Sequence, residues 1–583
     1  MPEKKVLRGT ALLRSVILSA TATLLLSLVG CVGIPSSGSV TVGDAIEEGD
    51  AGVEFFPLGP DPGATREEVL RGFVGAASSS ADDYGVARQF LARGFSKQWN
   101  PRTGVVVRTS TERVAALDDA TMEYSIQVAA DINAGGTFRQ NDTPVPLTLS
   151  FGFVQQKGEW RIDSAADGVV LSDVVFQSTF DPHAVYFLDP TATRLVPDLR
   201  WFPGGSASLR IVDALLDGPP DWLQGAVRSA FPDGTRLETS TVEVQDGIAD
   251  VDLTTEVLTA SADERHLMQV QLAASFARVA NVREVNISVG GTPLPIGQPT
   301  ASDPVSNPRV DIRAMVELGG KFGYLAGGAA TSIAQLGPNI VATSPIDVTV
   351  ADDLASAVTR GPGGVWLARS TGAEPQLVDA RTEVVPPSLD NYGWIWSASA
   401  AMPGTIRVID FGGVAYDLPT EFAADSSIVS IDVSRDGARV ALLLQTPTGP
   451  RLVVRAITRD ATGDQRPQSL SDAILDTTAA TGTALDATWV DELSVATLRR
   501  ERGETVGGEA LGGNEQVDNT VVTVHEIGGR RTALGSVAGA TALVGANGEL
   551  GLRALGPDGT IVERTASGWS DTGVVVGLIA TQR

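Results

Sequence analysis

The chain of 583 residues contains a single cysteine, Cys31. One thiol cannot form a disulfide within the chain, so the folded protein has to be stabilised by buried apolar surface alone. A chain of this length can bury several hydrophobic cores, each in its own domain. The sequence therefore predicts a multidomain protein without intrachain disulfide bonds, in which Cys31 serves another purpose.

Cys31 follows a segment with the layout of an export signal. Basic residues near the start precede a short apolar run, and small residues stand just before the cysteine. The residues Leu28, Val29, Gly30 and Cys31 resemble a lipobox, the signal of bacterial lipoproteins. The resemblance implies that a signal peptide of residues 1–30 is removed and that the thiol of Cys31 is lipidated. Two or more acyl chains would anchor the protein durably to the cell membrane.

Two other interpretations of this segment remain open. One is an ordinary secretory signal with a cysteine placed there by chance. The other is a transmembrane helix, but the apolar run is shorter than the ~20 residues that a span requires, and no second hydrophobic span follows it. We therefore expect a lipid-anchored protein on the extracytoplasmic face of the cell membrane.

The net charge of the chain is −26 at pH 7, and removal of the basic signal peptide makes the remainder still more acidic. Binding to nucleic acid depends on Lys and Arg side chains that neutralise phosphates. An electrostatic attachment to anionic lipid needs a polybasic segment. The composition therefore argues against nucleic acid as a partner and against membrane attachment by charge.

Residues 31–61 are rich in Gly, Ser, Pro and acidic residues, which is typical of a tether. Residues 62–180 then combine helical and strand patterns and are predicted to form an α+β domain. Two helical segments come first, several strands follow, and the last strand begins with Glu159-Trp160-Arg161-Ile162. This order and this ending resemble the NTF2-like fold, which implies helices packed on a curved antiparallel sheet. We interpret Trp99 and Trp160 as core aromatic residues and assign them no ligand.

Local signals mark the starts of the two helices in this domain. Thr65 and Glu68 have the spacing of a capping box, in which each residue binds the backbone of the other. Asp82 or Asp83 is expected to begin the second helix, because Asp is a preferred N-cap residue.

Residues 181–300 carry the clearest pattern of a compact α/β domain. Asp246-Gly247 is a strong hairpin signal, and the stretch Ser261–Glu264 forms a capping box before a helix with an apolar stripe. Three blocks in this order resemble the GerMN domain of bacterial sporulation and germination proteins, namely Asp213–Pro220, Ala230–Thr235 and Gly247–Leu253. The resemblance implies an extracytoplasmic module that serves in binding or assembly and has no catalytic role.

Residues 301–583 change to a β pattern. Short strands recur in groups with Asp-Gly or Asn-Gly turns, as in Val429–Leu442 and Thr541–Leu552. Recurring groups of short antiparallel strands favour a β-propeller, and a β-sandwich is the alternative. The copies are too irregular to determine the number of blades. The polar, Gly-rich stretch Arg499–Asn519 is predicted to be a long exposed loop.

The sequence carries no motif that supports an enzyme. His525 and Glu526 begin like a zinc-binding helix, but no second His follows at the required spacing, and the preceding residues are typical of a strand. The stretch Gly204–Ser208 lacks the final Gly of a nucleophile elbow. Asp250 and Asp252 alternate with apolar residues and are expected on the solvent side of a hairpin. We therefore predict no catalytic residue, no metal site and no cofactor.

Taken in order, the lipobox, the tether, the NTF2-like domain, the GerMN domain and the propeller resemble the actinobacterial LpqB lipoprotein family. The resemblance implies a partner. LpqB lipoproteins are associated with the MtrA/MtrB two-component system and are thought to contact the extracytoplasmic region of the sensor histidine kinase MtrB. Such contact would tune the signalling of the kinase and affect the cell envelope and division.

Two other functional classes stay open at this point. One is a lipoprotein that binds a cell-wall glycan or a small solute, for example in the central channel of the propeller. The other is an envelope hydrolase, which the missing catalytic motifs disfavour.

Overall fold

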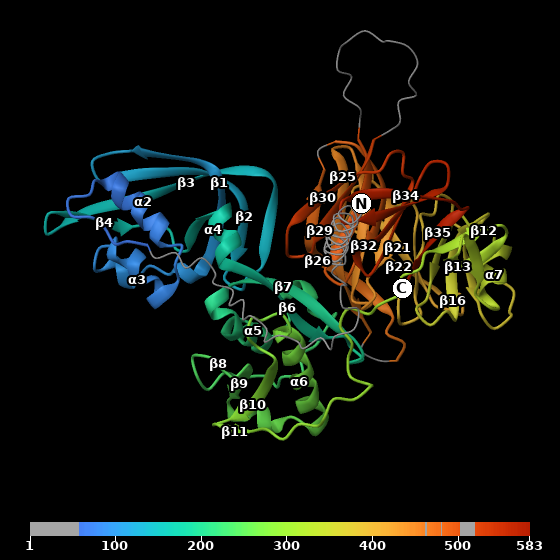
Figure 1. Cartoon of the computed structure of the whole chain (residues 1–583), viewed down its shortest axis with the longest axis horizontal. Helices are drawn as coiled ribbons and strands as arrows, with labels where there is room; N and C mark the ends of the chain where they lie inside the picture. Colours follow the sequence, from blue (N-terminus) through green and yellow to red (C-terminus); the bar gives the residue numbers. More distant parts are fainter. Residues whose placement is uncertain (1–56, 461–462, 480, 502–518) are drawn as a thin grey trace, which may run out of the picture. The chain divides into compact units, whose positions relative to one another are not determined.

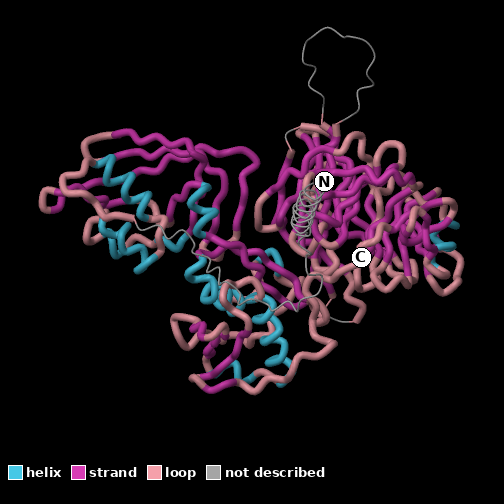
Figure 2. The backbone as a smooth tube through the Cα atoms, viewed as in Figure 1, coloured by secondary structure: helices cyan, strands magenta, loops and turns pink. Residues whose placement is uncertain are grey.

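The computed structural model describes residues 57–460, 463–479, 481–501 and 519–583. The predicted lipobox, with Cys31, lies outside the described residues, as does most of the predicted tether. The segment Gly52–Arg583 forms one compact unit. Its helices belong mainly to the first half of the chain, and its second half is almost entirely β-strand (Figures 1 and 2).

The N-terminal domain packs helices on a curved five-stranded sheet, as the sequence predicts (Figure 1). The strand order is β4-β3-β2-β1-β5, and β5 runs parallel to β1. Trp99 is 2% exposed and meets the ring of Phe73 edge-on at 5.1 Å, which confirms its place in the core, whereas Trp160 is only half-buried. The elements are α2 (Arg66–Ala76), α3 (Ala81–Gln89), β1 (Gly104–Ala116), β2 (Thr121–Asn133), β3 (Phe138–Gln156), β4 (Glu159–Ser164), β5 (Val169–Ser172) and α4 (Asp173–Thr179).

One of the two helix starts predicted in this domain is confirmed, and the other is wrong. The backbone N–H of Thr65 donates to the carboxylate of Glu68 at 2.7 Å, and the backbone N–H of Glu68 donates to the Thr65 hydroxyl, which completes the capping box. Helix α3 has Ser80 as its N-cap, so neither Asp82 nor Asp83 caps it. Both Asp residues have left-handed backbone angles inside the first turn, a conformation that Asp tolerates better than most residues.

The central domain joins a long hairpin to a small α/β unit. Strands β6 and β7 form a two-stranded sheet, and the second sheet has the order β11-β10-β9-β8 with α6 connecting the parallel strands β9 and β10. Asp246 and Gly247 adopt φ values of 52° and 78°, which confirms the predicted tight turn. The elements are β6 (Phe180–Leu188), β7 (Leu195–Pro203), α5 (Ala207–Leu216), β8 (Glu243–Gln245), β9 (Ile248–Leu253), α6 (Ala262–Phe276), β10 (Glu284–Val289) and β11 (Thr292–Pro293).

Apolar residues of both helices of the central domain fill its core. Leu215 on α5 and Met268 on α6 have no exposed surface, and neither do the inward residues of β9. Helix α6 begins at Ser261, whose hydroxyl accepts a hydrogen bond from the backbone N–H of Glu264, so the predicted capping box is confirmed.

The C-terminal region is a β-propeller and not a β-sandwich. Four of its sheets contain four strands each, in the orders β19 to β22, β23 to β26, β27 to β30 and β31 to β34. An eight-stranded sheet contains two further blades, joined where β35 runs parallel to β15 over two residue pairs. The described part of the chain therefore forms six blades, and β35 closes the ring by pairing with β12.

The bounds of the propeller elements follow the predicted strand groups closely. Arg499 and Arg500 are the last residues of β28 and not part of a loop, while residues 502–518 lie outside the described residues. The elements are β12 (Met315–Leu318), β13 (Lys321–Ala326), β14 (Ala329–Ser332), α7 (Leu336–Ala342), β15 (Asp347–Val350), β16 (Ser356–Gly361), β17 (Gly364–Arg369), β18 (Gln376–Asp379), β19 (Ser388–Leu389), β20 (Ile395–Ala398), β21 (Thr405–Ile409), β22 (Ala415–Pro419), β23 (Ser427–Val433), β24 (Arg439–Thr446), β25 (Gly449–Arg459), β26 (Pro467–Thr478), β27 (Thr483–Trp489), β28 (Ser494–Arg500), β29 (Thr520–Glu526), β30 (Arg531–Ser536), β31 (Ala542–Ala546), β32 (Gly548–Leu555), β33 (Thr560–Thr565), β34 (Gly568–Val575) and β35 (Leu578–Gln582).

Candidate functional site

The residues that the sequence singled out for possible chemistry do not come together. His525 lies on β29 and its Nε2 is 3.1 Å from the hydroxyl of Thr497. Asp250 and Asp252 lie on the outer side of β9, where the hydroxyl of Ser288 bonds to both carboxylates. Within the described ranges, no group of three or more His, Cys, Asp or Glu side chains could hold a metal ion.

The Gly204–Ser208 stretch forms a short 3-10 turn followed by the start of α5. Ser206 is the N-cap residue of that helix. The local structure is therefore a helix start, and it has no resemblance to the strand-to-helix turn that presents a catalytic serine.

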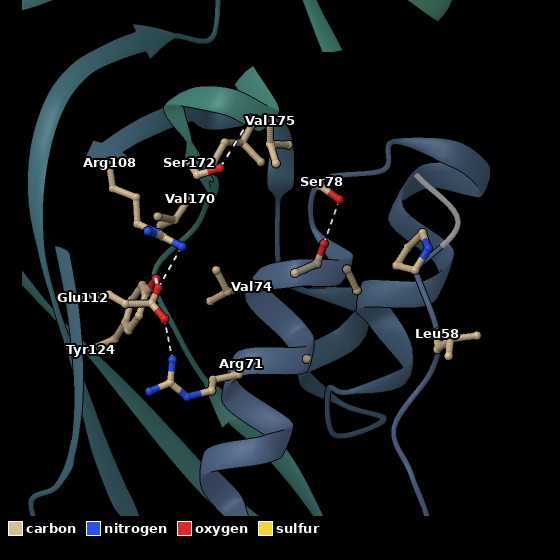
Figure 3. Close-up of a pocket in the computed structure, with 15 residues that line it drawn as sticks. Leu58, Arg71, Val74, Ser78, Arg108, Glu112, Tyr124, Val170, Ser172 and Val175 are labelled. Carbon is tan, nitrogen blue, oxygen red and sulfur yellow. Dashed lines mark hydrogen bonds and ion pairs between the residues drawn. The ribbon is translucent and has the colours of Figure 1, made fainter. Parts of the chain in front are cut away.

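The N-terminal domain contains a cavity of about 500 Å³ between α2, β1, β5 and α4 (Figure 3). Apolar side chains form most of its wall, and a polar cluster lies at one end. The lining residues are Pro57, Leu58, Arg71, Gly72, Val74, Gly75, Ala76, Ser78, Arg108, Glu112, Tyr124, Val170, Leu171, Ser172 and Val175.

The polar cluster is centred on the carboxylate of Glu112. The hydroxyl of Tyr124 donates to it at 2.6 Å, Arg108 forms an ion pair with it at 2.8 Å, and Arg71 forms a second ion pair. Figure 3 shows Glu112 between the two guanidinium groups, with Val74 facing the same space. The cluster therefore joins α2, β1 and β2 at the end of the cavity.

An irregularity in β1 makes this cluster possible. In a regular strand, residues four apart are separated by ~13 Å, too far for the ion pair between Arg108 and Glu112. The pairing of β1 with β2 shifts between these two residues, because Arg108 faces Val128 and Glu112 faces Ile126. The residues between them bulge out of the ladder, and the two side chains meet.

The partners of Glu112 set the protonation state of the cluster. Burial alone would raise the pKa of Glu112, but the hydrogen bond from Tyr124 and the charges of Arg108 and Arg71 outweigh it and lower the pKa. Burial and the bond to Glu112 raise the pKa of Tyr124. Glu112 is therefore ionised at neutral pH and Tyr124 keeps its proton.

The central domain is joined to the propeller by polar contacts at one end of the blades. The hydroxyl of Tyr392 donates to Asp189 at 2.6 Å, and the hydroxyl of Tyr186 donates to Glu492 at 2.6 Å. Tyr392 follows β19 and Glu492 follows β27, which are the innermost strands of their blades. Both contacts therefore lie at the same end of the central channel of the propeller. Leu493, beside Glu492, belongs to the hydrophobic core of the central domain.

The interior of the propeller is crossed by a buried ion pair. Arg583, directly after β35, pairs with Asp432 on β23. These inner strands belong to opposite blades of the ring, so the pair spans the centre. Both side chains are less than a tenth exposed. The sequence suggested the central channel of the propeller as a site for a small solute. The side chains of Arg583 and Asp432 occupy this channel where they meet.

The N-terminal domain also contacts the propeller. The guanidinium of Arg531 pairs with Asp142 at 2.5 Å, and the hydroxyl of Thr477 donates to the same carboxylate at 2.6 Å. Arg530 pairs with Asp173 at 2.8 Å. All three domains of the Gly52–Arg583 unit are thus linked by specific side-chain contacts.

Sequence reasoning missed both the pocket cluster and the interdomain contacts. Arg71 and Glu112 are far apart in the chain, and the bulge in β1 has no turn residue to announce it. The one local signal is the run of Thr and Ser between Arg108 and Glu112, which interrupts the apolar alternation of the strand.

Among the described residues, no helix combines the length and the apolar character needed to cross a membrane.

Comparison with known proteins supports the three-domain organisation. Residues 59–177 match the model described as "Lipoprotein LpqB, N-terminal domain", residues 184–295 match "Sporulation and spore germination", and residues 332–573 match "Lipoprotein LpqB beta-propeller domain". None of these descriptions names an enzyme.

Curated relatives carry the same family name. The chain is 27% identical over 465 residues to Lipoprotein LpqB of Cutibacterium acnes, covering 74% of this chain and 77% of the relative. It is 27% identical over 457 residues to the protein of that name from Mycolicibacterium smegmatis, covering 71% of this chain and 76% of the relative. It is 30% identical over 291 residues to the protein of that name from Thermobifida fusca, covering 47% of this chain and 46% of the relative. With its N-terminal domain, GerMN domain and β-propeller, the chain belongs to the LpqB lipoprotein family.

Proposed function

We propose that this protein is a lipid-anchored lipoprotein of the extracytoplasmic membrane face that binds the sensor histidine kinase MtrB. Binding modulates signalling through the MtrA/MtrB system and thereby affects the cell envelope and division. Membership of the LpqB family supports this role.

The observation that carries the proposal is the attachment of the GerMN domain to one end of the propeller. Asp189 and Tyr186 bind loops that follow the inner strands, so the GerMN domain covers that end. The loops that precede the inner strands lie at the opposite end and expose acidic side chains, including Glu421 and Asp425. A partner surface rich in Lys or Arg would complement this end.

The lipid on Cys31 would hold the protein on the same membrane as the kinase. Confinement raises the effective concentration of each partner for the other, so a weak contact suffices for regulation. The hydrogen bonds between the GerMN domain and the propeller favour one orientation of the acidic end, and a preferred orientation lowers the entropy that binding has to overcome.

Crosslinking in intact cells, followed by capture of the protein and identification of MtrB, tests the proposal. The double variant Glu421→Lys/Asp425→Lys should reduce the crosslink yield and change the phosphorylation of the response regulator MtrA. Glu374→Lys, an exposed residue in a loop at the covered end, is the matched control and should change neither. Unchanged phosphorylation of MtrA in a deletion strain, together with no MtrB in the crosslinked material, would contradict the proposal.

A further inference from the structure

The cavity of the N-terminal domain has the two-part character of a site for an amphiphile. Val74, Val170, Leu171 and Val175 provide apolar wall, and the Glu112 cluster provides a polar end. The volume of about 500 Å³ falls within the range of sites that enclose one small ligand. Both parts are formed by the N-terminal domain alone, so the site depends neither on the kinase nor on the lipid anchor.

One buried donor in the polar end has no acceptor in the protein. The Nη1 of Arg108 donates to the carbonyl of Thr109 at 3.0 Å and its Nη2 pairs with Glu112, but its Nε is buried without a hydrogen-bond partner. Buried polar atoms in folded proteins are nearly always bonded. A ligand oxygen in the cavity would supply the missing acceptor.

The charges of the polar end compensate one another. Arg71 pairs with both Glu67 and Glu112, and Arg108 pairs with Glu112. Glu112 is the carboxylate that lines the cavity, and Glu67, which is about half exposed and does not line it, compensates Arg71 from beside it. Each guanidinium group thus already has a carboxylate partner, and an anionic head group would have to compete with Glu112. The site therefore favours a neutral oxygen, such as that of an ester or a hydroxyl group, over a carboxylate or a phosphate.

We propose that this cavity binds a neutral single-chain amphiphile. The hydrocarbon chain lies along the valine wall, where its burial drives binding. The ester or hydroxyl oxygen of the head group accepts a hydrogen bond from the Nε of Arg108. A monoacylglycerol has this chemistry.

Calorimetric titration of the Gly52–Arg583 unit with monodecanoylglycerol, decanoate and glycerol tests the proposal, because this unit is compact by itself. Monodecanoylglycerol, below its aggregation concentration, should bind saturably with one molecule per chain. Glycerol should not bind, because it lacks the chain, and decanoate should bind at least about tenfold more weakly, because its charge would have to be desolvated. No saturable binding of monodecanoylglycerol, or tighter binding of decanoate, would overturn the proposal.

Two variants on neighbouring residues of α4 locate the site. Val175→Trp fills the cavity and should weaken binding at least about tenfold. Val174, next to it, is 78% exposed and does not line the cavity, so Val174→Trp should leave the affinity unchanged. Equal effects of the two substitutions would place the ligand elsewhere and overturn the proposal.

Arg108→Lys and Arg108→Gln separate the hydrogen bond from the shape of the site. Arg108→Lys replaces the Nε donor by a methylene group and should weaken the binding of monodecanoylglycerol several-fold. Arg108→Gln keeps an amide N–H donor near the position of Nε and should weaken the binding less. If Val175→Trp melts at a lower temperature than the parent protein, Val74→Phe on α2 provides a second way to fill the cavity. Undiminished binding to a folded, cavity-filled variant would overturn the proposal.

Discussion

The hydroxyl of Tyr186 donates a 2.6 Å hydrogen bond to the carboxylate of Glu492, although 306 residues separate them in the chain. The second oxygen of Glu492 accepts from the backbone N–H of Asn307, on the segment that leads into the propeller. Burial raises the pKa of Glu492, and these hydrogen bonds oppose the shift. One carboxylate thus joins the GerMN domain, the connecting segment and the propeller.

Replacement of Tyr186 by Phe should lower the free energy of unfolding by about 1–3 kcal/mol, because it leaves a buried carboxylate without one of its donors. Urea unfolding of the Gly52–Arg583 unit measures this change. Tyr416→Phe is the control, because Tyr416 lies on the outer strand of a blade and is 37% exposed. Equal losses in the two variants would show that the Tyr186 contact contributes nothing specific.

Removal of the Arg583 guanidinium from the centre of the propeller should lower the free energy of unfolding more than Tyr186→Phe does. Arg583→Met leaves the buried Asp432 without its charged partner and should cost about 3–5 kcal/mol. The double variant Arg583→Met/Asp432→Asn should recover part of this loss, because the uncompensated charge is gone. Thermal melting of the single and double variants checks the prediction, and a double variant less stable than Arg583→Met would refute it.

The protein should lose stability in acid through His525. Burial, with the positive charges of Arg531 and Arg499, lowers the pKa of His525 to about 4, while an unfolded chain titrates near 6.5. Between these values the unfolded state binds a proton that the folded state does not, so stability is complete above about pH 6.5 and falls as the pH drops towards 4. The difference corresponds to at most about 3 kcal/mol.

Urea unfolding at a series of pH values measures this dependence on His525. His525→Gln keeps a polar side chain but cannot take up the proton, so its unfolding free energy should change less between pH 6.5 and pH 4. If the free energy of unfolding of His525→Gln changes with pH as steeply as that of the parent protein, another group causes the loss of stability in acid.

Substitution of Cys31 by Ala should abolish lipid attachment. The thiol is the site that the lipobox assigns to the lipid, and the chain has no other cysteine. The expected product is an uncleaved precursor or a released protein that lacks the mass of the acyl groups. Mass spectrometry of the membrane fraction checks this, and an unmodified Cys31 in the parent protein would contradict it.

The sequence by itself determined the features that neighbouring residues control. The capping boxes at Thr65 and Ser261 and the turn at Asp246-Gly247 are as predicted, because each depends on backbone contacts within a few residues. The apolar stripe of α6 and the alternation in β9 likewise identified buried faces. The helix start at Asp82 or Asp83 was predicted wrongly, because α3 begins directly after Ser80 and both Asp residues have left-handed backbone angles inside it.

Only the tertiary structure decided the features that join distant residues. The six-bladed ring closes when β35 pairs with β12 from the opposite end of the propeller segment, and no local pattern marks that partner. The ion pair between Arg108 and Glu112 exists because a bulge shortens the ~13 Å that a regular strand would leave between them. Long-range pairing depends on the complementarity of whole surfaces, so the cavity and the domain contacts emerge only when the chain is folded.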